Sequence, residues 1–324
     1  MNTYQDRFHQ EWSQLKDKHV RALAWLLTSP DLLDKNSAIW WHQIGTLDLP
    51  NPEQLRAWLL SLDAHPTALH EALKIHKFLR LGHYAEDLLV FYFNHVGLLY
   101  GHGVQVHNEK AETIGEFDYL LFTEGGLLHI ELATKFYLFH HASDPTKPSI
   151  ENQHSANHSA NVYDYVGPNL NDSLGAKMQK ILQRQLTLSQ HDAARKLIHS
   201  KIVAARALIK GWLFYRSSER RQVVPGINSN HCLGFWWTMT EFEQLAVPYA
   251  LKLDRLQWLA PAQVGIDEVL DKPLILDALQ RHFHVDSTPV MVAIMKKNGG
   301  VMQEFCRGMV VPNDWPERAA QIQH

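Results

Sequence analysis

Residues 115–137 read GEFDYLLFTEGGLLHIELATKFY, a stretch that predicts a charged β-hairpin. Two apolar runs flank the turn-rich spacer 123–126, which is the pattern of two antiparallel strands. Asp118 interrupts the first run, Glu131 interrupts the second, and Lys135 follows. Because strand side chains alternate between faces, we expect Glu131 and Lys135 to share one face. The hairpin can therefore carry its charges to a common site.

The hairpin is expected to belong to a larger α/β unit. Alternating apolar residues at 104–106 predict a strand before it, and a helical pattern over residues 67–96 precedes that strand. A second helix is expected at about residues 172–189, and the apolar run 201–215 reads as a further strand. The predicted order is helix, three-strand meander, helix and strand.

Three parts are expected along the chain. Residues 1–66 read as helical, because Trp and Leu recur every three or four positions between prolines. Residues 67–215 form the core, interrupted by a polar insertion at 140–171. Residues 216–324 hold mixed helix and strand patterns and are expected to pack on the core.

The composition excludes several classes of protein. A net charge of -3, from 31 basic and 34 acidic residues, argues against a protein that coats nucleic acid through its overall field. The two cysteines, Cys232 and Cys306, lie far apart, so neither a disulfide framework nor a cysteine zinc site is expected. The polar start and the lack of a long apolar run predict a cytoplasmic protein without a membrane span.

The two hairpin acids favour metal chemistry. Adjacent strands lie about 4.8 Å apart, so Asp118 and Glu131 could share a divalent ion if the register sets them side by side. Mg²⁺ takes oxygen ligands, and Lys135 nearby could position or deprotonate the attacking water of a phosphodiester hydrolysis. Solvated cross-strand pairs, worth only about 0.2 to 1 kcal/mol, explain the same charges and stay open as an alternative.

The flanking helices add polar groups to the predicted site. Glu86 and Gln185 each lie in an apolar stripe, and one shared hydrated pocket would satisfy them better than separate burial. A place at the margin of each stripe is the alternative. The other face of the second helix carries Lys177, Lys180 and Arg184, which could bind nucleic-acid phosphates or form an ordinary solvated cationic face.

Five stretches carry a resemblance to a known family: LGHYAEDLLVFYF, GEFDYLLF, HIELATKFYL, VGPNLNDSLGAKMQKILQRQL and LDRLQWLAP. They look like the uncharacterised bacterial family called domain of unknown function 1853, over about residues 79–315. The element order, with its acids, also resembles the PD-(D/E)XK phosphodiesterase superfamily. That resemblance implies a restriction-endonuclease-like core, with a mixed sheet flanked by helices and with helical N-terminal and mixed C-terminal additions.

The superfamily resemblance also implies roles for single residues. Asp118 matches the first acid of the motif and Glu131 the second, so both would bind Mg²⁺ or Mn²⁺. Glu86 matches a helix acid that helps to hold the metal through water, and Gln185 matches a glutamine that faces the site.

The lysine departs from the superfamily motif. The usual spacing would place it at position 133, where this chain has Ala133, and Lys135 comes two residues later. The two positions share a strand face, but they lie about 6.6 Å apart along the strand. Catalysis would then depend on whether the long side chain of Lys135 reaches back to the metal.

These observations predict a Mg²⁺- or Mn²⁺-dependent nuclease that acts on DNA more readily than on RNA. A catalytically inactive nuclease-like module, which binds nucleic acid or a protein partner, is the alternative. A third possibility is an interaction protein whose working surface is formed by the Trp-rich N-terminal helices and the C-terminal hairpin. The sequence does not predict the oligomeric state.

Overall fold

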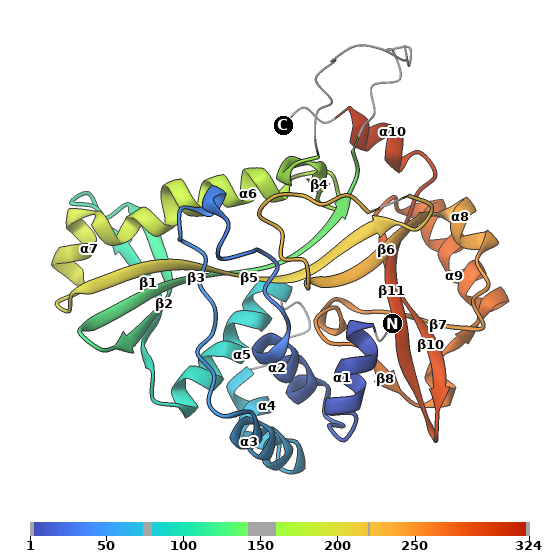
Figure 1. Cartoon of the computed structure of the whole chain (residues 1–324), viewed down its shortest axis with the longest axis horizontal. Coiled ribbons are helices and arrows are strands. Elements are labelled where there is room, and N and C mark those ends of the chain that lie inside the picture. The colour runs from blue at the N-terminus through green and yellow to red at the C-terminus, as the bar shows by residue number, and fades with distance from the viewer. Residues whose placement is uncertain (1–2, 74–79, 142–159, 220, 322–324) are drawn as a thin grey trace.

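A computed structural model describes residues 3–73, 80–141, 160–219 and 221–321 of the chain (Figure 1). Within these ranges the protein is an α/β protein with ten α-helices and one mixed sheet of eleven strands. The helices are α1 Tyr4–Trp12, α2 Lys18–Thr28, α3 Pro52–Ala64, α4 Thr67–Leu73, α5 Leu81–His95, α6 Leu174–Lys180, α7 Asp192–Leu197, α8 Met239–Gln244, α9 Lys272–Val285 and α10 Trp315–Ala320. The strands are β1 Leu99–His107, β2 Thr113–Thr123, β3 Gly126–Phe139, β4 Tyr165–Val166, β5 Ile202–Arg216, β6 Cys232–Thr238, β7 Tyr249–Lys252, β8 Gln263–Val264, β9 Leu270–Asp271, β10 Val290–Asn298 and β11 Val301–Val311.

The sheet joins the predicted core to the C-terminal part. Its order is β1-β2-β3-β5-β6-β11-β10-β7-β9, with β4 added to β3 and β8 added to β11. The first three strands form an antiparallel meander, whereas β3, β5, β6 and β11 are parallel neighbours. A single sheet therefore runs from the meander to the C-terminal hairpin, and the division of the chain into three parts stays a prediction.

Helices cover both faces of the sheet beside β3 (Figure 1). Helices α1 to α5 lie on one face, where Ile130 and Leu132 of β3 belong to their hydrophobic core. Helix α6 lies on the other face, where Ala133 and Tyr137 belong to a second core. Alternate side chains of β3 thus point into two different cores, as the period of a strand requires.

Most of the expected elements are confirmed. The structure contains the three-strand meander and strand β5, and the mixed C-terminal part includes helix α9 and the hairpin of β10 and β11. The helix expected over residues 67–96 appears as α4 and α5, with residues 74–79 outside the described chain. Most of the predicted insertion at 140–171 also lies outside it. Among described residues, no helix is long and apolar enough to span a membrane.

The second expected helix is less regular than predicted. Instead of one α-helix to about residue 189, α6 ends at Lys180 and a π-helical turn, η3 Ile181–Gln185, follows. A 3₁₀ segment, η4 Leu186–Gln190, completes it. A π turn holds an extra residue, so it rotates the residues after it relative to the regular helix before it. Such turns are frequent at functional sites.

Strands β2 and β3 separate at the predicted site. Their pairing runs from Thr123 opposite Gly126 to Tyr119 opposite Ile130 and stops there. Beyond this point β3 stays paired with β5, but residues 131–137 have no strand partner on the β2 side in the described structure. We call this stretch the open edge of β3.

Strand β5 holds the other edge of β3 unusually closely. Gly211 lies opposite Lys135 and has a φ of +154°. A Cβ atom at Gly211 would come 1.8 Å from the carbonyl oxygen of Lys135. Only glycine therefore allows this approach, which fixes the backbone that carries Lys135.

Candidate functional site

The two hairpin acids lie where β2 and β3 separate. The carboxylate of Asp118 accepts a hydrogen bond from the backbone N–H of Leu132 at 2.9 Å. Glu131 is 1% exposed, and its two oxygens contact Nε2 of His129 at 2.7 Å and Nε2 of Gln185 at 2.5 Å. Three of the predicted site residues, Asp118, Glu131 and Gln185, therefore come together.

Burial raises the pKa of both acids. For Asp118, the negative charges of Glu131 and, to a smaller extent, Glu86 raise the pKa further. For Glu131, burial is opposed by a hydrogen bond from the backbone of Asp118 and by the positive charge of Lys177. Two carboxyl groups with raised pKa values at one place favour the binding of a proton or a cation.

His129 supports Glu131 from the same strand face. Burial lowers the pKa of His129 to about 4, so the ring is neutral at physiological pH. Its Nε2 lies 2.7 Å from Oε1 of Glu131, while the buried Nδ1 has no hydrogen-bond partner among the described residues. The ring packs edge-on against Phe117 at 4.7 Å between centroids. Sequence reasoning gave His129 no role, although the alternation of the strand places it on the face of Glu131.

Glu86 reaches the site from helix α5. Its charge contributes to the raised pKa of both Asp118 and Glu131, which places it within electrostatic range of the pair. The Glu86 carboxylate contacts Nδ1 of His83 at 3.1 Å. The hydroxyl of Tyr119 donates to the backbone carbonyl of Glu86 at 3.0 Å and so fixes α5 against β2.

Lys177 belongs to the site rather than to an outer cationic face. Its Nζ donates to Oε1 of Gln185 at 3.4 Å, so Gln185 links the lysine to Glu131. Burial lowers the pKa of Lys177, with further lowering by Lys135 and Lys180, while the two hairpin acids raise it. The predicted phosphate-binding group is thereby divided, because Lys180 and Arg184 are exposed and Lys177 is half-buried.

Lys135 contacts the loop before α6. Its Nζ lies 3.4 Å from Oδ2 of Asp172, and the hydroxyl of Tyr137 donates to the same oxygen at 2.9 Å. Lys135 lines a cavity of about 810 Å³ along the open edge of β3. It lowers the pKa of Lys177, so the two amines remain within electrostatic range.

The acid pair fits a hard divalent cation. Mg²⁺ needs only one or two protein carboxylates and keeps several waters, and each carboxylate oxygen has two acceptor sites. Asp118 and Glu131 thus retain capacity for a cation beside their hydrogen bonds. In the described chain, no group of three or more His, Cys, Asp or Glu side chains is arranged to hold a metal. Two carboxylates completed by water are a donor set that Mg²⁺ or Mn²⁺ could take.

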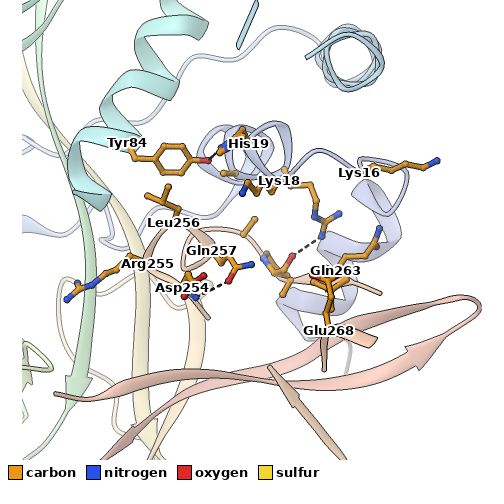
Figure 2. A pocket seen from close by; sticks show the side chains of 16 residues that line it. Lys16, Lys18, His19, Tyr84, Asp254, Arg255, Leu256, Gln257, Gln263 and Glu268 are labelled. Carbon is orange, nitrogen blue, oxygen red and sulfur yellow. Dashed lines mark hydrogen bonds between the residues drawn. The ribbon is translucent and has the colours of Figure 1, made fainter. Parts of the chain in front are cut away.

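A separate cavity of about 730 Å³ lies between α2, the start of α5 and residues 254–268. Figure 2 shows Tyr84 and His19 pointing toward each other on its wall, with 2.8 Å between the hydroxyl and Nδ1. Tyr84 precedes Glu86 by two residues on α5. None of the predicted site residues lines this cavity, so it is distinct from the acid site.

The raised pKa values predict a pH-dependent gain in stability from Asp118→Asn. The amide oxygen keeps the hydrogen bond from Leu132, while the buried charge is removed. An acid with a raised folded pKa stabilises the fold below its unfolded pKa and loses this contribution as pH rises through the folded pKa. The metal-free variant should therefore be more stable than the wild type by roughly 1–3 kcal/mol at pH 8 and by less at pH 5.

Urea unfolding at both pH values measures this difference. Glu116→Gln serves as the control, because Glu116 is an exposed carboxylate on the same strand that contacts Gln105 at 3.1 Å. An Asp118→Asn variant that is less stable than the wild type at pH 8 would show that the acid pair is not strained.

The comparisons with curated proteins and with solved structures gave no match. The family model described as "Domain of unknown function (DUF1853)" matches residues 21–311. The chain therefore belongs to this family.

Proposed function

We propose that this protein is a Mg²⁺- or Mn²⁺-dependent phosphodiesterase that cleaves nucleic acid, DNA more readily than RNA. The observation that carries the proposal is the pair of acids, the half-buried Asp118 and the buried Glu131, at the point where two strands separate. Burial raises the pKa of both, and a divalent cation would offset the negative charge of the pair and bind a substrate phosphate. Both cysteines are free, which fits the reducing cytoplasm in which we place the reaction.

The arrangement of elements supports a restriction-endonuclease-like core. Helix α5, the meander β1 to β3, helix α6 and strand β5 follow the order that the resemblance to the PD-(D/E)XK superfamily implies. Strand β5 lies parallel to β3, and α5 and α6 lie on opposite faces. The superfamily assignment is part of our proposal and rests on this order and on the acids.

The acids and the glutamine have separate roles in the proposed site. Asp118 and Glu131 hold the cation, and Glu86 assists through water. When bound, the cation would lower the pKa of its water and neutralise charge on the phosphate. Gln185 fixes the orientation of Glu131 from one side while the neutral ring of His129 fixes it from the other.

Two lysines are candidates for stabilising the phosphate charge in the transition state. We retain Lys135 in the catalytic role implied by its position after the second acid. Lys177 is the second candidate, because it contacts Gln185, and Gln185 contacts Glu131 directly. A half-buried amine in this position would be worth more than one in water, because the local dielectric constant is lower.

A binding module without catalytic activity is the alternative function. The observation in its favour is the ion pair between Lys135 and Asp172, which holds the lysine away from the acids. Ala133, at the usual lysine position, offers no amine of its own. In that case the same fold would bind nucleic acid or a protein partner without hydrolysis.

Removal of either acid should abolish hydrolysis. Asp118→Asn and Glu131→Gln are expected to lower the Mn²⁺-dependent cleavage of labelled DNA by about 100-fold or more, because each removes one of the two proposed metal ligands. Glu116→Gln removes an exposed carboxylate from strand β2 and should leave cleavage unchanged. If wild-type protein and both acid variants show the same activity on DNA and RNA, the proposal is wrong.

The two lysines can be separated by kinetics. Lys177→Met keeps the length of the side chain but removes its charge, and kcat should fall by about 100-fold with little change in KM, as for an interaction made in the transition state. Lys135→Ala should also abolish hydrolysis while the fold remains intact, as checked by an unchanged unfolding midpoint. A wild-type kcat for Lys177→Met would mean that its contact with Gln185 is structural only.

A further inference from the structure

The open edge of β3 lines a cleft that leads away from the acids. The cavity of about 810 Å³ is lined by residues 134–137 of β3, by residues 80–82 at the start of α5 and by the loop before α6. Segments of the C-terminal part, at 252–255 and 288–291, form its other side. No strand covers this edge in the part of the chain that the structure describes.

Positive charge predominates in the cleft. Its cations are Arg80, Lys135, Lys252 and Arg255, and its carboxylates are Asp172 and Asp254. Asp172 is already bound by Lys135 and by the hydroxyl of Tyr137. No ion pair within 4 Å is found for the other three cations among the described residues. The cleft therefore has an uncompensated positive charge, which favours an anion.

The start of helix α5 adds hydrogen-bond donors to the cleft. Helix α5 begins after Arg80, which makes no side-chain cap, and its first turn holds no acidic residue. The N–H groups at such a helix start, where Leu81 and Gly82 line the cleft, attract negative charge.

The cleft begins at the proposed active site. Gly82 lies one helical turn before Glu86, and a Cβ atom at Gly82 would come 3.9 Å from Oε1 of Glu86. Thr134 follows Glu131 by three residues, or about 10 Å along the same strand. A chain of phosphates that crosses the acids can therefore continue into the cleft.

We propose that this cleft binds a phosphate next to the scissile one, so that the substrate strand lies along the open edge of β3. The start of α5 and the exposed cations Arg80 and Lys252 are the binding groups. The identification of the ligand as a nucleic-acid strand rests on the proposed function, whereas the binding of phosphate itself does not require catalysis.

Binding without metal tests the cleft separately from catalysis. Fluorescence anisotropy of a labelled single-stranded DNA 12-mer in EDTA is measured for wild type and for Arg80→Ala/Lys252→Ala. The double variant should bind about tenfold more weakly, and the slope of log affinity against log salt should become shallower by the amount expected for about two lost phosphate contacts.

A charge-matched pair provides the control. Lys35→Ala/Lys297→Ala removes two exposed lysines outside the cleft and should bind DNA like wild type. Competition with inorganic phosphate and with a mononucleotide distinguishes the sources of the phosphate. The strand is expected to bind far more tightly than either small ligand, and equal affinities would contradict a strand-binding cleft.

The two proposals can fail independently. If the Arg80/Lys252 variant binds DNA like the Lys35/Lys297 control, the cleft proposal is overturned, even where wild-type protein cleaves DNA. If binding is lost as expected but no cleavage occurs with Mn²⁺, the cleft proposal stands and the catalytic function fails.

Discussion

The hydrogen bond from the backbone of Leu132 to the carboxylate of Asp118 is the interaction on which the site depends. In a continuous ladder, the amide of Leu132 would find its partner on the backbone of β2. Here the pairing ends at Tyr119 and Ile130, and a side chain takes the place of the missing carbonyl. The two strands can separate without leaving this backbone donor unsatisfied, and the separation leaves the edge of β3 beyond Glu131 without a strand partner on the β2 side among the described residues.

The buried carboxylates raise the free energy of the folded protein, and a bound ligand can lower it. Glu131 is buried with both oxygens in contact with neutral side chains, and its negative charge opposes the ionisation of Asp118. Lys177 offsets part of that repulsion across Gln185. Groups held in unfavourable environments persist where the surrounding structure fixes them, and such places are commonly functional sites. A cation bound between the acids would relieve their unfavourable burial, and this relief would contribute to the free energy of binding.

The strand pattern predicted the convergence of the acids, but it could not predict how they are held. Counting back from the turn at Thr123 and Gly126 brings Asp118 opposite Glu131, so their approach follows from the hairpin alone. The end of the ladder does not follow, because it depends on packing of β2 against its other neighbours. Regular helical spacing placed Lys177 and Lys180 on one face. No local signal indicated that Gln185, which lies on the π turn, would contact Lys177.

Contacts between distant segments were also beyond the sequence pattern. Lys135 binds Asp172 across the polar insertion, and nothing near the lysine indicates this partner. The extent of the sheet was not predicted either, because the sequence patterns of strand β6 and of the C-terminal hairpin indicated only local elements. Their parallel pairing through β11 joins segments whose separation in sequence hides the register.

Anomalous diffraction from crystals soaked in Mn²⁺ tests the central claim most directly. The account predicts one strong anomalous peak within about 2.5 Å of carboxylate oxygens of both Asp118 and Glu131, with no peak at that place in Asp118→Asn crystals. Binding at that position would establish the acid pair as a metal site. Crystals that take up Mn²⁺ elsewhere, or not at all, while the two acids keep their contacts to Leu132 and Gln185, would contradict it.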